Sequence, residues 1–127
     1  MEETFRSLLL NSGPVSSVVG SRVNFGAHPQ GAPLPAIVLN TVSDVNEHHL
    51  NAPETLSQAR VQVDCYADSY GGAKLLSRAV RSALDGEKTA FQGVFFENSR
   101  DGREGGTNEA DRPFRVSVDF LVVYNIT

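Results

Sequence analysis

The chain has little of what several classes of protein require. Its 127 residues include one cysteine, Cys65, which excludes an intrachain disulfide and a cysteine-based zinc module. No stretch reaches the roughly 20 apolar residues of a membrane span, and Met1–Arg6 lacks the basic and apolar regions of a secretory leader. Acidic residues outnumber basic ones by 15 to 11, and a net charge of −4 has the wrong sign for a domain that binds a nucleic-acid phosphate backbone through its overall charge. We therefore expect a single domain, residues 1–127, that binds neither membrane nor nucleic acid.

Four segments have the pattern of β-strands. Residues 59–67 and 114–124 alternate apolar and polar side chains, as strands with one buried face do. Residues 36–42 are rich in β-branched side chains, and residues 91–98 carry three phenylalanines. The polar segment 44–54, which contains a proline, is expected to be a connection.

Helical spacing occurs at the start and in the middle of the chain. Residues 2–11 place apolar side chains on one face, and residues 15–19 extend the pattern by about one turn. Residues 70–85 have a continuous apolar face, with Asp68 or Ser69 as the expected N-cap and Gly86 at the left-handed C-terminal position. The sequence predicts an α+β, two-layer sandwich: a mainly antiparallel four- to five-stranded sheet, the main helix (about 70–85) packed on one face, and a short N-terminal helix.

The segment 99–111 is rich in glycine and charge and has no large apolar side chain. Such a composition buries too little surface to become ordered by itself. We therefore predict a mobile loop that becomes ordered against a neighbouring molecule.

No group of residues forms a recognisable catalytic motif. Cys65 falls on the apolar side of its strand, where a thiol is usually inert. His48 and His49 could bind a metal together with His28, but neighbouring histidines point in different directions. Asp64 and Asp119 could form a carboxylate pair. A small α+β enzyme or ligand-binding domain remains an alternative on these residues, and an adaptor that dimerises through a sheet edge is another.

Several packing patterns together carry a family resemblance. They are the Leu8–Leu10 run, the stretch 18–23 (VVGSRV), the strand entry 33–38 (PLPAIV), the strand 59–67 (ARVQVDCYA) that runs directly into a helix, and the strand 115–120 (RVSVDF). In this combination the chain resembles the tail-completion, or tail-terminator, proteins of long-tailed bacteriophages and of the related gene transfer agents. The resemblance covers nearly the whole chain.

The resemblance implies a structural virion protein rather than an enzyme, with no cofactor. It implies a ring, commonly of six copies, that caps the head-proximal end of the tail tube and joins the tail to the capsid. The implied partners are copies of the chain, the tail tube protein and the head–tail connector proteins. DNA would pass through the ring without specific binding, which suits the net charge of −4. The implied location is the virion tail, with the bacterial cytoplasm before assembly.

A ring needs two different contact surfaces on each copy. We expect them on the polar face of strand 59–67, on the basic side of helix 70–85 and in the 99–111 segment. The candidate interface residues are Arg60, Gln62, Asp64, Lys74, Arg78, Arg81, Arg100, Arg103 and Glu104.

Overall fold

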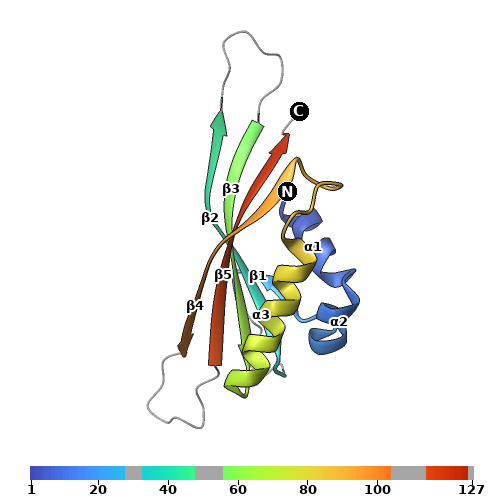
Figure 1. Ribbon diagram of the computed structural model, residues 1–127, viewed down its shortest axis with the longest axis vertical. Coiled ribbons are helices and arrows are strands. Elements are labelled where there is room, and N and C mark those ends of the chain that lie inside the picture. Colours follow the sequence, from blue (N-terminus) through green and yellow to red (C-terminus); the bar gives the residue numbers. More distant parts are fainter. Residues whose placement is uncertain (28–32, 48–55, 104–113, 126–127) are drawn as a thin grey trace.

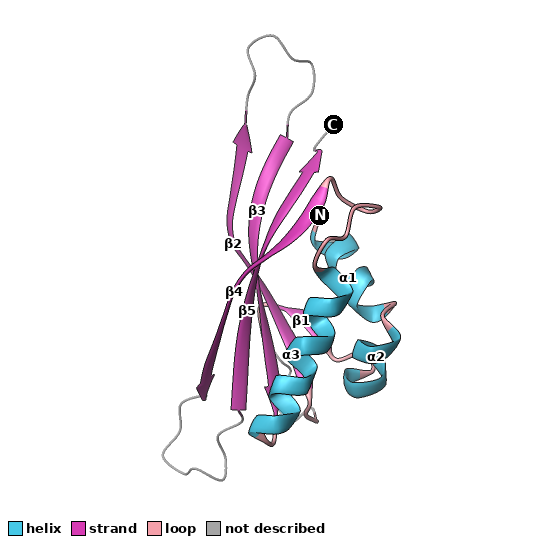
Figure 2. Cartoon of the chain, viewed as in Figure 1, coloured by secondary structure: helices cyan, strands magenta, loops and turns pink. Residues whose placement is uncertain are grey.

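Three helices lie against one face of a five-stranded sheet (Figures 1 and 2). The computed structural model describes residues 1–27, 33–47, 56–103 and 114–125. The helices are α1 (Glu2–Leu10), α2 (Gly13–Val19) and α3 (Tyr70–Leu84). The strands are β1 (Val23–Phe25), β2 (Ala36–Glu47), β3 (Leu56–Ala67), β4 (Gly93–Arg103) and β5 (Phe114–Asn125).

The strand order across the sheet is β1-β2-β3-β5-β4. The short strand β1 runs parallel to β2, and the other three pairings are antiparallel. Because the helices cover only one face, the sheet has a helix-covered face and an open face (Figure 2). The predicted fold class is confirmed: the chain is α+β, with a mainly antiparallel sheet and the main helix on one face.

The core lies between the sheet and the helices. Val61, Val63 and Cys65 alternate along β3 and are fully buried, as the odd-position pattern predicts. At the centre the ring of Phe120 meets the rings of Phe5 and Phe96 edge-to-face, with centroids 6.4 and 6.2 Å away. Apolar side chains from α1, β4 and β5 therefore meet at one residue.

Helix α3 begins and ends as its sequence predicts. The Ser69 side-chain oxygen accepts a hydrogen bond from the Gly72 amide at 3.0 Å, which caps the helix. Gly86 has a φ of 81°, which favours glycine after the last turn. Leu76 and Val80 are fully buried, and Ser77 on the same side donates its hydroxyl proton to the Lys74 carbonyl at 2.7 Å. The helix therefore packs on the sheet through a nearly apolar face.

Strand β2 is longer than predicted. The expected connection from residue 44 is wrong for residues 44–47, which pair with β3 as far as Glu47 opposite Leu56. The ladder shifts register between Thr41 and Ser43, so Asp44 lies opposite Ala59 on the helix-covered face. Pairing with a strongly β-forming partner outweighs the polar composition of this segment.

Strand β4 also differs from its prediction at both ends. It spans Gly93–Arg103 instead of residues 91–98, and residues 99–103 are strand where a mobile loop was expected. Each of these five residues lies opposite a residue of β5, from Val118 to Phe114. Backbone pairing orders a segment whose side chains bury little. Residues 104–111, including Glu104, lie outside the described residues, as does the side chain of Arg103.

The two hairpins extend the molecule in opposite directions (Figure 1). The end of β2 and the start of β3 reach beyond the helices at one end, and the end of β4 and the start of β5 lie at the other. Among the described helices, none is long and apolar enough to cross a membrane.

Candidate functional site

Four of the predicted interface residues lie together on the open face of the sheet. Gln62 and Asp64 of β3 stand opposite Asp119 and Ser117 of β5, and Arg100 of β4 also stands opposite Ser117. Arg60 follows on the same side of β3. The register of three strands therefore gathers residues that lie far apart in the sequence.

A hydrogen-bonded chain connects five of these residues. Asp64 Oδ1 accepts from Gln62 Nε2 at 2.9 Å and from Ser117 Oγ at 2.6 Å. Arg100 donates from Nη2 to Gln62 Oε1 at 2.9 Å and from Nη1 to Asp119 Oδ2 at 2.6 Å. We call Gln62, Asp64, Arg100, Ser117 and Asp119 the open-face network. Asp64 and Ser117 are buried within it although no described helix covers this face.

An ion pair lies beside the open-face network. Arg60 Nε and Nη2 donate to the two carboxylate oxygens of Glu97 at 2.7 and 3.2 Å, which is a bidentate geometry. The hydrogen bond from Arg60 to Glu97, together with the charge of Glu97, raises the pKa of Arg60. Glu97 occupies the register shift of β4 between Phe96 and Asn98. The bulge gives this carboxylate its place on the open face.

The network makes a stability prediction. Replacement Asp64→Ala leaves the buried Ser117 hydroxyl and the Gln62 amide without their acceptor, and we expect a loss of about 2 kcal/mol in the free energy of unfolding. Asp64→Asn keeps an oxygen acceptor and should lose less than half as much. Urea unfolding of the three proteins measures this difference. Equal losses for the two variants would show that the charge, and not the hydrogen bonds, stabilises the network.

The basic side chains of α3 lie on the other face of the sheet, beside β4. Lys74 Nζ lies 2.8 Å from Asp101 Oδ1, and the Tyr70 hydroxyl donates to Asp101 Oδ2 at 2.8 Å. The hydrogen bond from Lys74, and then that from Tyr70, lowers the pKa of Asp101. Arg81 stacks on the Phe96 ring, with Cζ 3.8 Å from the ring centroid. Two of the three cations are thus engaged within the chain.

Arg78 differs from its two neighbours. Its side chain is exposed and makes neither a hydrogen bond nor an ion pair with the residues that the structure describes. It lines a groove of about 170 Å³ between α3 and β4. The groove is lined by Lys74, Ser77, Arg78, Arg81, Phe96, Ser99 and Val118. We call Lys74, Arg78 and Arg81 the basic stripe; it and the open-face network lie on opposite faces of the sheet.

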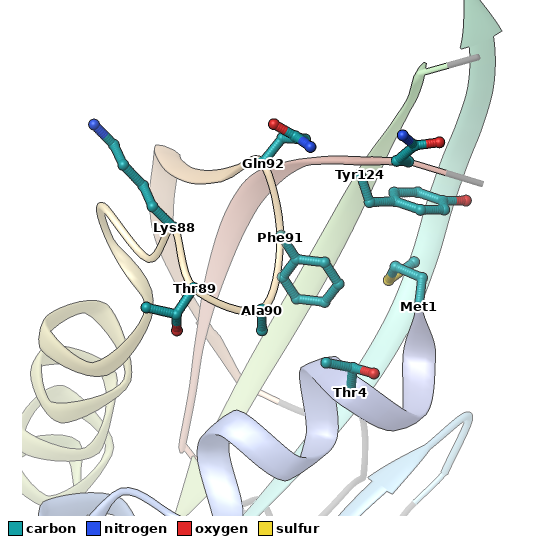
Figure 3. A pocket seen from close by; sticks show the side chains of 9 residues that line it. Met1, Thr4, Lys88, Thr89, Ala90, Phe91, Gln92 and Tyr124 are labelled. Atoms are coloured by element: carbon teal, nitrogen blue, oxygen red, sulfur yellow. The ribbon is translucent and has the colours of Figure 1, made fainter. Parts of the chain in front are cut away.

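A second cavity, of about 360 Å³, lies at the start of α1 (Figure 3). It is bounded by Met1 and Thr4, by the loop that carries Lys88 and by Tyr124 near the end of β5. In Figure 3 the Lys88 side chain extends away from Tyr124 and Met1. The lining combines hydroxyl, amide and apolar groups from three separate segments.

The structure does not bring the other sequence candidates into one reaction centre. Cys65 is fully buried, and its burial raises the pKa of the thiol, which disfavours the nucleophilic thiolate. Asp64 and Asp119 share the open face, but each carboxylate is held by the network described above and neither lines the two cavities. The three histidines lie outside the described residues, and within those residues no cluster of three possible metal ligands occurs.

Sequence reasoning missed several residues of these surfaces. Ser117 and Asp119 belong to the polar alternation of β5 but were not among the predicted interface residues. The partner considered for Asp119 was Asp64, whereas Gln62 stands opposite it. The role of Glu97 was not predicted because it lies in a bulge that breaks the alternation of β4. The role of Asp101 was not predicted because its segment was expected to be a loop. Strand register, which pairs residues far apart in the sequence, supplies what was missing.

The fold therefore places a helix layer and a basic stripe on one face of a sheet and an ordered polar network on the other. This chain matches the family model "Tail completion protein gp17" over residues 4–125 and belongs to that family. The resemblance inferred from the sequence is thus confirmed, and the family assigns the chain a structural role in a phage-type tail.

A solved structure has a similar fold. A chain of the structure titled "Virion of native gene transfer agent (GTA) particle" superposes with a TM-score of 0.71 at 20% sequence identity. The similarity covers 98% of this chain and 94% of the other. A search of curated proteins finds no match.

Proposed function

We propose that the chain caps the head-proximal end of a tail tube as a ring of copies and forms the surface to which the capsid is joined. The observation that carries this proposal is the family match over residues 4–125. The fold shared with a chain of a gene transfer agent particle supports it, because the similarity spans almost the full length of both chains. In this role the chain acts by binding copies of itself, the tube and the connector, and not by catalysis.

The two surfaces suit assembly. The basic stripe and the open-face network lie on opposite faces of the sheet, so one copy can present different residues to different partners. Arg60, Gln62, Asp64 and Arg100 would contribute one contact, and Lys74, Arg78 and Arg81 another. The network holds its side chains in fixed positions before binding, which lowers the entropic cost of association.

Removal of the gene from the producing cell tests the function. We expect joined particles to fall at least 100-fold, with free capsids and tails of irregular length, because an uncapped tube has no surface for the capsid. Negative-stain microscopy counts joined particles and measures tail lengths, and a plasmid copy of the wild-type gene is the control. Joined tails of normal length in the deletion strain would overturn the proposal.

A further inference from the structure

The edge strand β4 is covered along only one half. Val94 N donates to Glu87 O at 3.1 Å, and Phe96 N donates to Asp85 Oδ1 at 3.1 Å. The amides of Val94 and Phe96 therefore point away from β5. The turn after α3 covers this part of the edge, as natural proteins commonly protect exposed strand edges.

The other half of β4 has no such cover. Val94 stands opposite Val122 of β5, and Ser99 stands opposite Val118. Val118 and Val122 are an even number of residues apart, so Ser99 and Val94 occupy equivalent positions relative to β5. Since residues of an antiparallel pair alternate in direction, the amide of Ser99 also points away from β5, as do those of Asp101 and Arg103. These amides have no backbone partner among the described residues. We call residues 99–103 the open β4 edge.

The edge at the other end of the strand order is also covered along only part of its length. Strand β1 covers the first part of β2, where Ile37 N donates to Arg22 O at 2.9 Å and Leu39 O accepts from Gly26 N at 2.9 Å. Beyond Leu39, no described strand pairs with the outer side of β2. We call residues 40–47 the open β2 edge.

The register also gives the direction of the amides along the open β2 edge. Relative to β3, Asp44 and Asn46 occupy positions equivalent to that of Ile37, whose amide points away from β3. The amides of Asp44 and Asn46 therefore also point outward. Val42 and Val45 lie in this segment and are 58% and 60% exposed. An unpaired edge with exposed apolar side chains favours pairing with another strand.

We infer that the open β4 edge of one copy pairs antiparallel with the open β2 edge of the next copy, so that one continuous sheet runs around the ring. The inference rests on the proposed ring. The two edges lie at opposite sides of the sheet, as a head-to-tail contact requires. Three successive antiparallel pairings make β2 and β4 run in opposite directions, so copies that point the same way bring these strands together antiparallel.

Charge supports the same pairing. The basic stripe lies beside the open β4 edge on the helix-covered face, where Arg78 and Ser99 line one groove. On that same face, Glu2 accepts a hydrogen bond from Thr41 of β2 at 3.3 Å, and Asp44 lies nearby on the strand. Edge pairing therefore brings cations of one copy towards acids of the next, and Lys74, paired with Asp101, offsets the charge of Asp101 where that residue meets Asp44.

The positions of the two edges fit a closed ring. Followed across the paired strands, Asp101 at the centre of the open β4 edge lies in line with Cys65 of β3. Asp44 in the open β2 edge lies in line with Ala59 of β3, so the two edges are offset by six residues. This offset is about 20 Å along the strands at about 3.3 Å per residue, and the four strands β2, β3, β5 and β4, about 4.8 Å apart, span about 19 Å per copy. If neighbouring copies are related by rotation alone, the strands must be tilted by about 46° from the ring axis, close to the upper end of the roughly 35–45° range of closed barrels.

Disulfide trapping tests the pairing in assembled particles. With Asp101 opposite Asp44 of the next copy, Ser99 lies opposite its Asn46 as a hydrogen-bonded pair, whose Cα separation of about 5.5 Å suits a disulfide. The double variant Ser99→Cys/Asn46→Cys should give a ladder of cross-linked species, ending at the copy number of the ring, on a non-reducing gel of purified particles. Each single variant is a matched control and should run as a monomer. The buried Cys65 does not compete.

A backbone variant tests the pairing without new cysteines. Ser99→Pro removes an outward amide and no described hydrogen bond, as proline on an edge strand can. It should lower joined particles at least tenfold and leave the melting temperature of the free protein within a few degrees, whereas Ser99→Ala should assemble normally. Wild-type yields with Ser99→Pro, together with no ladder from the double variant, would overturn the edge pairing. If microscopy still locates the chain at the tail end, the proposed function stands; absence from that end would overturn the function itself.

Discussion

The replacement Phe120→Ala should remove about 3–5 kcal/mol from the free energy of unfolding, the largest stability loss expected for a single side chain here. Phe120 is fully buried, and its ring contacts Phe5 of α1 and Phe96 of β4. The truncation leaves a cavity where the helix layer meets two strands, and close-packed surroundings collapse only in part. Domains of this kind are stable by about 5–15 kcal/mol, so the loss is a large share of the total.

Phe95→Ala provides the matched control for Phe120→Ala. Phe95 lies on the adjacent strand, and its ring is 45% exposed above Gly93 on the open face. The same chemical change should therefore cost less than about 1 kcal/mol. Thermal unfolding followed by circular dichroism should show a fall of roughly 10–15 °C for Phe120→Ala and a few degrees for Phe95→Ala. Similar falls for the two variants would show that Phe120 is not the centre of the core.

Strong alternation made much of the fold predictable from sequence. In residues 59–67 of β3 and 114–124 of β5 the positions that face the helices are apolar, and the open-face positions are polar except Leu121 and Val123, so the faces of both strands could be assigned without knowing their partners. Helix α3 could be bounded by Ser69 and Gly86, because capping is a local property of the chain. These features depend on neighbours within a few residues.

The two extended hairpins could not be predicted in this way. Apart from Val45, residues 44–47 and 99–103 carry no large apolar side chain and have low intrinsic β propensity, yet each segment pairs with a strand that alternates strongly. In β4 the bulge at Glu97 moves the outward positions from odd to even numbers. The alternation seen before residue 97 therefore says nothing about the face of Arg100.

The same limit applies to the candidate site. Arg100 and Gln62 are 38 positions apart in the sequence and meet only because β5 lies between their strands. The alternation of β3 could place Arg60, Gln62 and Asp64 on one face of the strand. It could not show that Asp64 is buried among the residues that it contacts on that face. Charge pairing along α3 depends likewise on Asp101, which sequence composition assigned to a loop.

Charge reversal at Arg78 should strongly reduce assembly. Arg78 is exposed and makes no ion pair or hydrogen bond with the described residues, so Arg78→Glu should fold normally. Arg81 is less suitable, because it stacks on Phe96. Under the proposed edge pairing, the new carboxylate would face Glu2 and Asp44 of the next copy. A penalty of only about 1 kcal/mol per contact is repeated at every interface of a ring, so joined particles should fall at least tenfold.

Lys88→Glu is the matched control for Arg78→Glu, since it makes the same charge change on the loop beside the second cavity, away from the basic stripe. It should leave the yield of joined particles unchanged. The double variant Arg78→Glu/Glu2→Arg restores opposite charges between neighbouring copies and should recover much of the yield. Screening at 0.5 M salt should also reduce the defect, because the Debye length falls to about 4 Å. Recovery by neither the second substitution nor salt would show that Arg78 acts on the tube or connector and not on a neighbouring copy.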